Sequence, residues 1–122
     1  MQPDPIRSIS VVIPVFQEEA NLAALCEQLW PVLGSLEIDV EVIFVDDGST
    51  DGSFHTLREI ADTRTGVRVI SFRRNAGQTA AMQAGIDAAS HEAIVPLDAD
   101  LQNDPADTVS YTHLRAHETT RH

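Results

Sequence analysis

The sequence has no lysine, a single cysteine and no long hydrophobic run among its 122 residues. Because Cys26 stands alone, an internal disulfide framework and a multi-cysteine zinc site are excluded, and a reducing cytosol is the expected compartment. The longest uninterrupted apolar run, Val11 to Phe16, is far too short to span a membrane. No basic region followed by an apolar stretch marks a secretory signal at the N-terminus. These absences predict a cytoplasmic globular protein.

Positive charge is also scarce. Eight arginines stand against 19 acidic residues, which gives a net charge of −11. A broad nucleic-acid interface needs clustered cations that displace counterions from phosphates, so no nucleic-acid partner is expected. The acids either hold a divalent cation that carries a phosphorylated ligand or simply keep a small protein soluble. With 43% hydrophobic residues, the composition is typical of one folded domain.

Four short β-branched runs alternate with three segments of helical spacing. The runs predict strands at 8–14, 40–45, 67–72 and 93–97, and the spacing predicts helices near 22–33, 53–61 and 78–89. Gly34 is the expected C-cap of the first helix, and Ser49, Thr50 or Asp51 the expected N-cap of the second. Alternating strands and helices predict an α/β fold with a doubly wound, mostly parallel, Rossmann-like sheet.

Polar residues follow the predicted strands at their carboxyl ends, where sheets of this kind bind ligands. Asp98 and Asp100 follow the fourth strand one residue apart, so both can turn into a cleft. Such hard oxygen ligands suit Mg²⁺ or Mn²⁺, and Gln102 offers a further neutral oxygen. In an arbitrary loop these acids would simply be solvated. Their place directly after a strand favours a metal site.

The second strand ends in Asp46 and Asp47, followed by Gly48, which permits a tight turn. A carboxylate here can accept a hydrogen bond from a nucleotide base or a ribose hydroxyl. Alternatively, Asp47, Ser49 and Asp51 only cap the second helix. Both roles are compatible, because neighbouring side chains differ in direction.

The ends of the first and third strands carry weaker signals. Pro14 kinks the end of the first strand, and Phe16 and Glu18 place an aromatic ring and an acid there. Alternatively, Phe16 is a core residue and Glu18 only interacts with the dipole of the following helix. Arg74 could face a diphosphate, and Gly77 could permit close backbone approach, although exposed arginines also pair with surface acids.

Four segments in this order resemble the motifs of the family 2 glycosyltransferases of GT-A fold. They are ISVVIPVFQE at 9–18, VDDGSTD at 45–51, RNAGQ at 74–78 and LDADLQNDP at 97–105. The resemblance spans about residues 8–107 and is closest to the branch that loads polyprenyl phosphates, with dolichol-phosphate mannose synthase and bacterial undecaprenyl-phosphate glycosyltransferases. Gln17 stands where that family usually has Asn, and Phe16 where it has Tyr. We expect these changes to loosen the first-motif contact slightly.

The resemblance implies sugar transfer with inversion, from a nucleotide-diphosphate sugar to a polyprenyl phosphate or other glycan acceptor, in cell envelope glycan biosynthesis. It implies that Pro14, Phe16 and Glu18 cradle the nucleotide, with Asp47 on the base and Asp46 nearby. It also implies a catalytic Mg²⁺ or Mn²⁺ on the diphosphate, held by Asp98, Asp100 and Gln102. The metal would neutralise charge on the departing nucleoside diphosphate. A phosphate acceptor is already an anion, so no strong general base is required.

Two other interpretations remain open. Phosphotransferases of the haloacid dehalogenase type also place an Asp-x-Asp after a strand, but normally the first strand, and they use a lysine that this sequence lacks. A nucleotide-sugar-binding fragment without turnover is the non-enzymatic alternative. A product assay separates it from a working transferase, whereas a binding assay does not.

The last residues differ in character from the rest of the chain. Residues 109–119 resemble one reading frame of a sequencing adapter, so 109–122 is expected to be a non-native tail outside the sheet. Residues 1–108 are then the nucleotide-sugar-binding half of a truncated glycosyltransferase domain. We expect this half to bind donor weakly without transferring sugar. Membrane association, at the inner face, is expected only through the missing C-terminal part.

Overall fold

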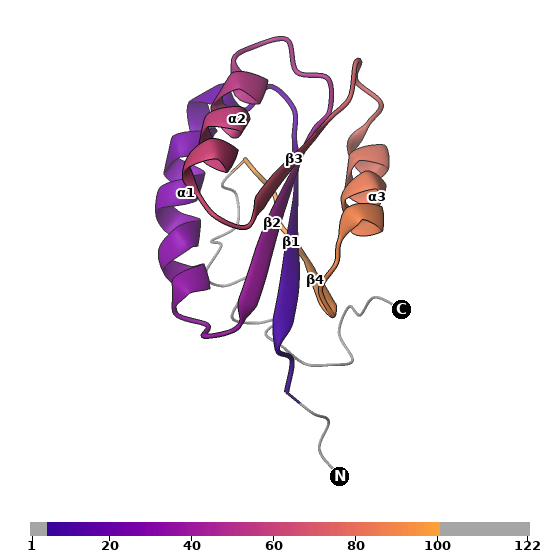
Figure 1. Cartoon of the computed structure of the whole chain (residues 1–122). Helices are drawn as coiled ribbons and strands as arrows, with labels where there is room; N and C mark the ends of the chain where they lie inside the picture. Colours follow the sequence, from indigo (N-terminus) through magenta and orange to yellow (C-terminus); the bar gives the residue numbers. More distant parts are fainter. Residues whose placement is uncertain (1–4, 101–122) are drawn as a thin grey trace.

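A computed structural model describes residues 5–100, which form a four-stranded sheet with helices on both faces (Figure 1). The strand order is β3-β2-β1-β4, and all three strand pairs are parallel. The elements in chain order are β1 (Ser8–Val15), α1 (Glu19–Gly34), β2 (Asp39–Asp46), α2 (Ser53–Thr63), β3 (Val67–Ser71), α3 (Gln78–Ala88) and β4 (Ala93–Pro96). The predicted α/β doubly wound fold is confirmed. The predictions for Gln102 and for residues 109–122 lie outside the described residues.

Helices α1 and α2 cover one face of the sheet, and α3 covers the other (Figure 1). Successive strand residues point to opposite faces, so β1 sends Val11 and Ile13 toward α1 while Val12 packs toward α3. Cys26 of α1 is buried as expected, and burial raises the pKa of its thiol although Arg64 opposes the shift. Among the described residues, no helix has the length and apolarity needed to cross a bilayer.

Two predicted helix caps are wrong. Gly34 is the last helical residue rather than a left-handed cap, because Ser35 closes the helix by donating from its amide to Pro31 and from its hydroxyl to Val32. The N-cap position of α2 is Gly52, one residue later than predicted. Ser49 and Thr50 instead form hydrogen bonds with the loop that follows β1. The Asp51 carboxylate still accepts the amide of Ser53, the first residue of α2, at 2.9 Å, and it also accepts the amide of Glu19 at the start of α1.

A buried carboxylate anchors the connection from α3 to β4. Glu41 of β2 is 6% exposed and accepts hydrogen bonds from the Ser10 hydroxyl at 2.5 Å and the Ser90 amide at 2.6 Å. The Ser90 hydroxyl and the Arg68 guanidinium donate to it as well, at 2.8 and 3.0 Å. Burial alone would raise the pKa of Glu41, but these donors outweigh burial and lower the pKa to about 2.

Glu41 is expected to make folding stability depend on acid. The folded pKa lies below the unfolded value of 4.5, so its contribution is complete above pH 4.5 and is lost as pH falls toward 2. The full shift corresponds to about 3 kcal/mol. Glu41→Gln should unfold more easily at pH 7, and its deficit against wild type should shrink toward pH 2.5 in urea titrations. Glu27→Gln, at an exposed site on α1, is the control. A deficit that is equal at every pH would contradict this role.

Candidate active site

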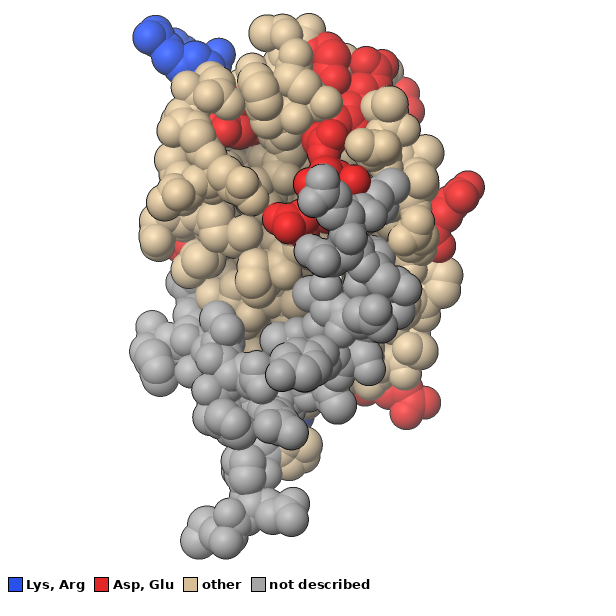
Figure 2. All heavy atoms as spheres, turned by 180° about the vertical axis from the view of Figure 1, so that it is seen from behind, with Lys and Arg blue, Asp and Glu red and all other residues tan. Residues whose placement is uncertain are grey.

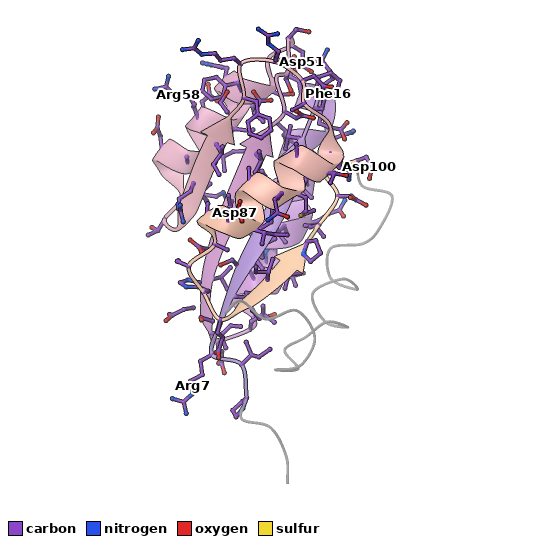
Figure 3. All side chains as sticks on the ribbon, turned by 90° about the vertical axis from the view of Figure 1, so that its right-hand side faces the viewer. Arg7, Phe16, Asp51, Arg58, Asp87 and Asp100 are labelled. Atoms are coloured by element: carbon purple, nitrogen blue, oxygen red, sulfur yellow. The ribbon has the colours of Figure 1, made fainter. Side chains whose placement is uncertain are left out.

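The carboxyl ends of the parallel strands meet at one edge of the sheet, and a cleft lies there. Its walls come from the end of β1, the residue after β2, the start of α3 and the segment after β4. The lining residues are Pro14, Val15, Phe16, Glu18, Asp47, Gln78, Asp98, Ala99 and Asp100. Phe16 and Asp100 both lie at this upper end in Figure 3, whereas Arg7 lies at the opposite end. All four sequence motifs, which are far apart along the chain, therefore contribute to one cavity.

The electrostatic character of this cleft is strongly acidic. Four of its lining residues are carboxylates, and none of the described lining residues is Lys or Arg. Figure 2 shows acidic side chains gathered over this end of the molecule. An anionic ligand such as a diphosphate would be repelled by this lining unless a cation enters with it. The donor set of Asp98 and Asp100 is of the hard oxygen type that Mg²⁺ and Mn²⁺ prefer, so these two residues fit such a cation.

Asp47 is buried, at 3% exposure, and its carboxylate holds the β3–α3 loop. One oxygen accepts the Ala76 amide at 2.7 Å, and the other accepts the Asn75 side-chain amide at 2.9 Å and the Gly77 amide at 3.1 Å. The predicted alternative, that Asp47 caps the second helix, does not match these bonds, since all three donors belong to another loop. Asp47 thus lines the cleft and also fixes the loop beside it.

Not every predicted nucleotide-binding residue lines the cleft. Asp46 is 2% exposed, and its carboxylate accepts the Ser49 amide at 3.3 Å within its own turn. Arg74 is exposed on the β3–α3 loop, and Gly77 precedes α3 with a positive φ of 105°. Both belong to the loop that Asp47 holds, but neither is among the lining residues.

Gln78 is a cleft residue that was not among the predicted site residues, although it ends the third motif, RNAGQ at 74–78. It is the first residue of α3, and its side-chain amide donates to Asp98 at 3.4 Å. Its place in that motif was the available signal, and in the structure the positive-φ Gly77 turns the chain into a helix whose start faces the sheet edge. Gln78 is therefore placed to orient one of the candidate metal ligands.

The two loops beside the cleft leave no room for a side chain at Gly48. Its φ is 73°, and a Cβ there would lie 2.3 Å from the backbone carbon of Arg74 and 2.3 Å from the backbone nitrogen of Asn75. Both contacts are with main chain, which cannot rotate away.

Gly48→Ala should therefore destabilise the protein by at least about 2 kcal/mol, from backbone strain and steric overlap together. Gly34→Ala is the matched control, because a Cβ at that helical glycine meets nothing within 4 Å. That control should be neutral or slightly stabilising. Urea unfolding of both variants measures the difference, and equal stability would contradict the described packing of these loops.

The fold places the chain among α/β proteins with a parallel, doubly wound sheet, and the sequence comparisons give its family. The profile of Glycosyl transferase family 2 matches residues 10–115, so the chain belongs to this family. The four sequence motifs predicted this family, and that prediction is confirmed. The family match gives no support to the haloacid dehalogenase alternative.

Curated relatives with stated activities are similar over most of the chain. Dodecaprenyl-phosphate galacturonate synthase of Rhizobium johnstonii is 43% identical over 110 residues, which are 88% of this chain and 32% of that protein. Undecaprenyl-phosphate 4-deoxy-4-formamido-L-arabinose transferase of Aeromonas hydrophila is 44% identical over 101 residues, 82% of this chain and 31% of that protein. The chain thus spans about a third of the length of these relatives.

Solved structures share the fold. The mannosyltransferase PcManGT of Pyrobaculum calidifontis, in complex with GDP-Man and Mn²⁺, has a TM-score of 0.66 and 26% identity, over 88% of this chain and 31% of that one. TarS 1–349 of S. aureus also has a TM-score of 0.66, with 20% identity over 85% of this chain and 30% of that one. The second likeness, at its low identity, concerns the fold alone.

Proposed function

We propose that the cleft binds a nucleotide-diphosphate sugar together with Mg²⁺ or Mn²⁺. The observation that carries this proposal is the acidic cleft itself, to which all four motifs of the sequence contribute. Asp98 and Asp100 would hold the metal, with Gln102 as a further oxygen ligand. The bound metal would neutralise the diphosphate of the donor and of the leaving group. The Mn²⁺ and GDP-Man bound to PcManGT support a ligand of this class.

The nucleotide is proposed to lie between the loops after β1 and β2. Phe16 is 47% exposed and is a large hydrophobic side chain presented at the cleft, which suits contact with the flat face of a base. Pro14 and Glu18 flank it, and Asp47 supplies a carboxylate on the other wall. Arg74 and Gly77, with Asp46 behind the turn, complete the proposed nucleotide site from the neighbouring loop. Space lies open beside Gly77, since a Cβ built on it would meet nothing within 4 Å, and its φ of 105° is one that residues with side chains rarely adopt.

The acceptor is proposed to be a polyprenyl phosphate. Both curated relatives described above are named for transfer to a polyprenyl phosphate, and each is more than 40% identical to this chain. In the proposed reaction an acceptor phosphate oxygen attacks the anomeric carbon of the sugar, and the bond from that carbon to the diphosphate breaks. In-line attack inverts the configuration at that carbon. Because the acceptor lipid resides in a bilayer, the proposed place of action is the cytoplasmic membrane surface.

Donor binding is tested by titrating the purified chain with UDP-, GDP-, CDP- and ADP-sugars, each with and without Mn²⁺. We expect at least one donor to bind, and to bind more tightly with Mn²⁺. The paired variant Asp98→Asn/Asp100→Asn should lose the Mn²⁺-dependent part. Failure of every donor to bind at millimolar concentration would contradict the proposal.

Transfer is tested in a chimera, because the chain spans about a third of its relatives. The matching third of the Rhizobium synthase is replaced by residues 10–100 of this chain. With a radiolabelled donor that binds in the titration, we expect organic-extractable sugar phospholipid. A folded chimera that binds donor but forms no lipid-linked sugar would contradict the proposal that this cleft presents the donor for transfer to a polyprenyl phosphate, and would leave donor binding intact.

A further inference from the structure

Gln17 has an unusual backbone conformation in the loop after β1. Its φ is 55°, in the left-handed region, where the backbone of any residue other than glycine is strained. Its neighbours Phe16 and Glu18 both line the cleft, whereas Gln17 does not. A strained residue persists only where its surroundings hold it in place. The contacts of Gln17 show what does so.

The side chain of Gln17 binds the backbone of the β2–α2 loop. Its oxygen accepts the amide of Thr50 at 2.6 Å and the amide of Asp51 at 3.2 Å. Its side-chain nitrogen donates to the Thr50 hydroxyl at 3.0 Å, and its backbone amide donates to the Ser49 hydroxyl at 3.0 Å. One residue thus makes four hydrogen bonds to three consecutive residues of another loop.

The next residues extend the same join. The Glu18 amide donates to the Ser53 hydroxyl at 3.0 Å, and the Gly52 amide donates to the Glu19 carboxylate at 2.8 Å. The join between 17–19 and 49–53 therefore fixes the first loop against the start of α2. Only Gln17 within it has a left-handed backbone, and only Gln17 stands between two lining residues of the cleft.

We propose that Gln17 is a positioning residue. Its side chain holds the loop in the left-handed conformation that turns Phe16 and Glu18 toward the cleft, without itself touching a ligand. From the sequence, Gln17 was expected to loosen the first-motif contact. In this proposal Gln17 instead secures the loop, because the length of its side chain lets one oxygen reach two successive amides. The consequence for nucleotide affinity rests on the proposed function, whereas the effect on the loop does not.

Three variants separate side-chain chemistry from bulk. Gln17→Met keeps the length and removes both polar atoms. Gln17→Glu keeps an oxygen for the Thr50 and Asp51 amides, and the Thr50 hydroxyl can donate to it in turn. Gln28→Met, at an exposed position on α1, is the control for the same change outside the loop.

The first readout is amide hydrogen exchange in the isotope-labelled chain without ligand. We expect the Thr50 and Asp51 amides to exchange at least about tenfold faster in Gln17→Met, and the signals of Phe16 and Glu18 to move, because the bonds that order them are gone. Gln17→Glu should resemble wild type, and Gln28→Met should change neither region. Unchanged exchange at Thr50 and Asp51 in Gln17→Met would overturn the proposal.

The second readout is affinity for UDP or GDP with Mn²⁺. Gln17→Met should bind about tenfold more weakly than wild type, whereas Gln17→Glu should keep most of the affinity. If both residues act through the Phe16 ring, adding Gln17→Met to Phe16→Ala should cause little further loss of affinity. Fully additive losses would overturn the proposed action through Phe16. A wild-type chain that binds neither nucleotide would contradict the proposed function, and amide exchange would still decide for or against the role of Gln17 in the loop.

Discussion

Asp98→Asn and Asp100→Asn are each expected to remove Mn²⁺-dependent binding of a nucleotide sugar while leaving the fold intact. Each change keeps an oxygen but removes the negative charge that a divalent cation requires. The loss should be at least about a hundredfold, because even groups that only orient metal ligands contribute 10–100-fold. Both side chains are exposed at the sheet edge, so the free energy of unfolding should change by less than about 0.5 kcal/mol.

Calorimetric titration with and without Mn²⁺ measures this effect. Asp62→Asn is the charge-matched control, since Asp62 is an exposed acid on α2 away from the cleft. Its Mn²⁺-dependent affinity should equal that of wild type. Unchanged affinity in both cleft variants would remove the metal role from Asp98 and Asp100. A loss in the control as well would indicate a general effect of net charge.

Asp47→Ala is expected to weaken nucleotide binding even without metal. The variant removes the proposed contact with the base, and it also leaves the Ala76 and Gly77 amides without their acceptor, while the Asn75 side chain keeps only the backbone carbonyl of residue 47. The β3–α3 loop should then move away from the cleft. We expect a loss of at least about tenfold in metal-free affinity, together with about 1–3 kcal/mol of stability from the unsatisfied donors.

Asn75→Ala separates these two roles of Asp47. It removes one donor to the carboxylate but leaves Asp47 able to face a base. If Asp47 contacts the base, Asn75→Ala should cost less affinity than Asp47→Ala at a comparable loss of stability. Lower melting temperature with unchanged affinity in Asp47→Ala would show that the carboxylate serves only the loop.

The sheet and its binding edge could be predicted from the sequence because they depend on local pattern. The β-branched runs mark the strands, and parallel strands bring their carboxyl ends to one edge, so Phe16, Asp47 and Asp98 had to lie near one another. Strand ends were predicted to within one residue, for instance β4 ending at Pro96 rather than residue 97. The local spacing of hydrophobic residues indicates directly where each strand begins and ends.

The bonds between loops could not be predicted in the same way. The side chains of Gln17, Asp47 and Glu41 form hydrogen bonds with residues at least 27 positions away in the sequence. Side-chain type alone does not say whether an Asp faces solvent, a base or a backbone amide. The burial of Asp46 and the left-handed Gln17 likewise depend on how two loops meet. Such contacts become visible only once the sheet edge is assembled.

Paramagnetic broadening by Mn²⁺ in the presence of a bound nucleotide sugar tests the central claim most directly. In an amide spectrum of the labelled chain, the signals of Phe16, Glu18, Gln78 and Asp98 should broaden first, since they line the cleft. Those of Arg7 and Glu92, joined by a hydrogen bond at the opposite end of β1, should stay sharp (Figure 3). Broadening centred on Arg7 and Glu92, or none at saturating donor, would contradict a metal-assisted nucleotide-sugar site at the carboxyl edge of the sheet.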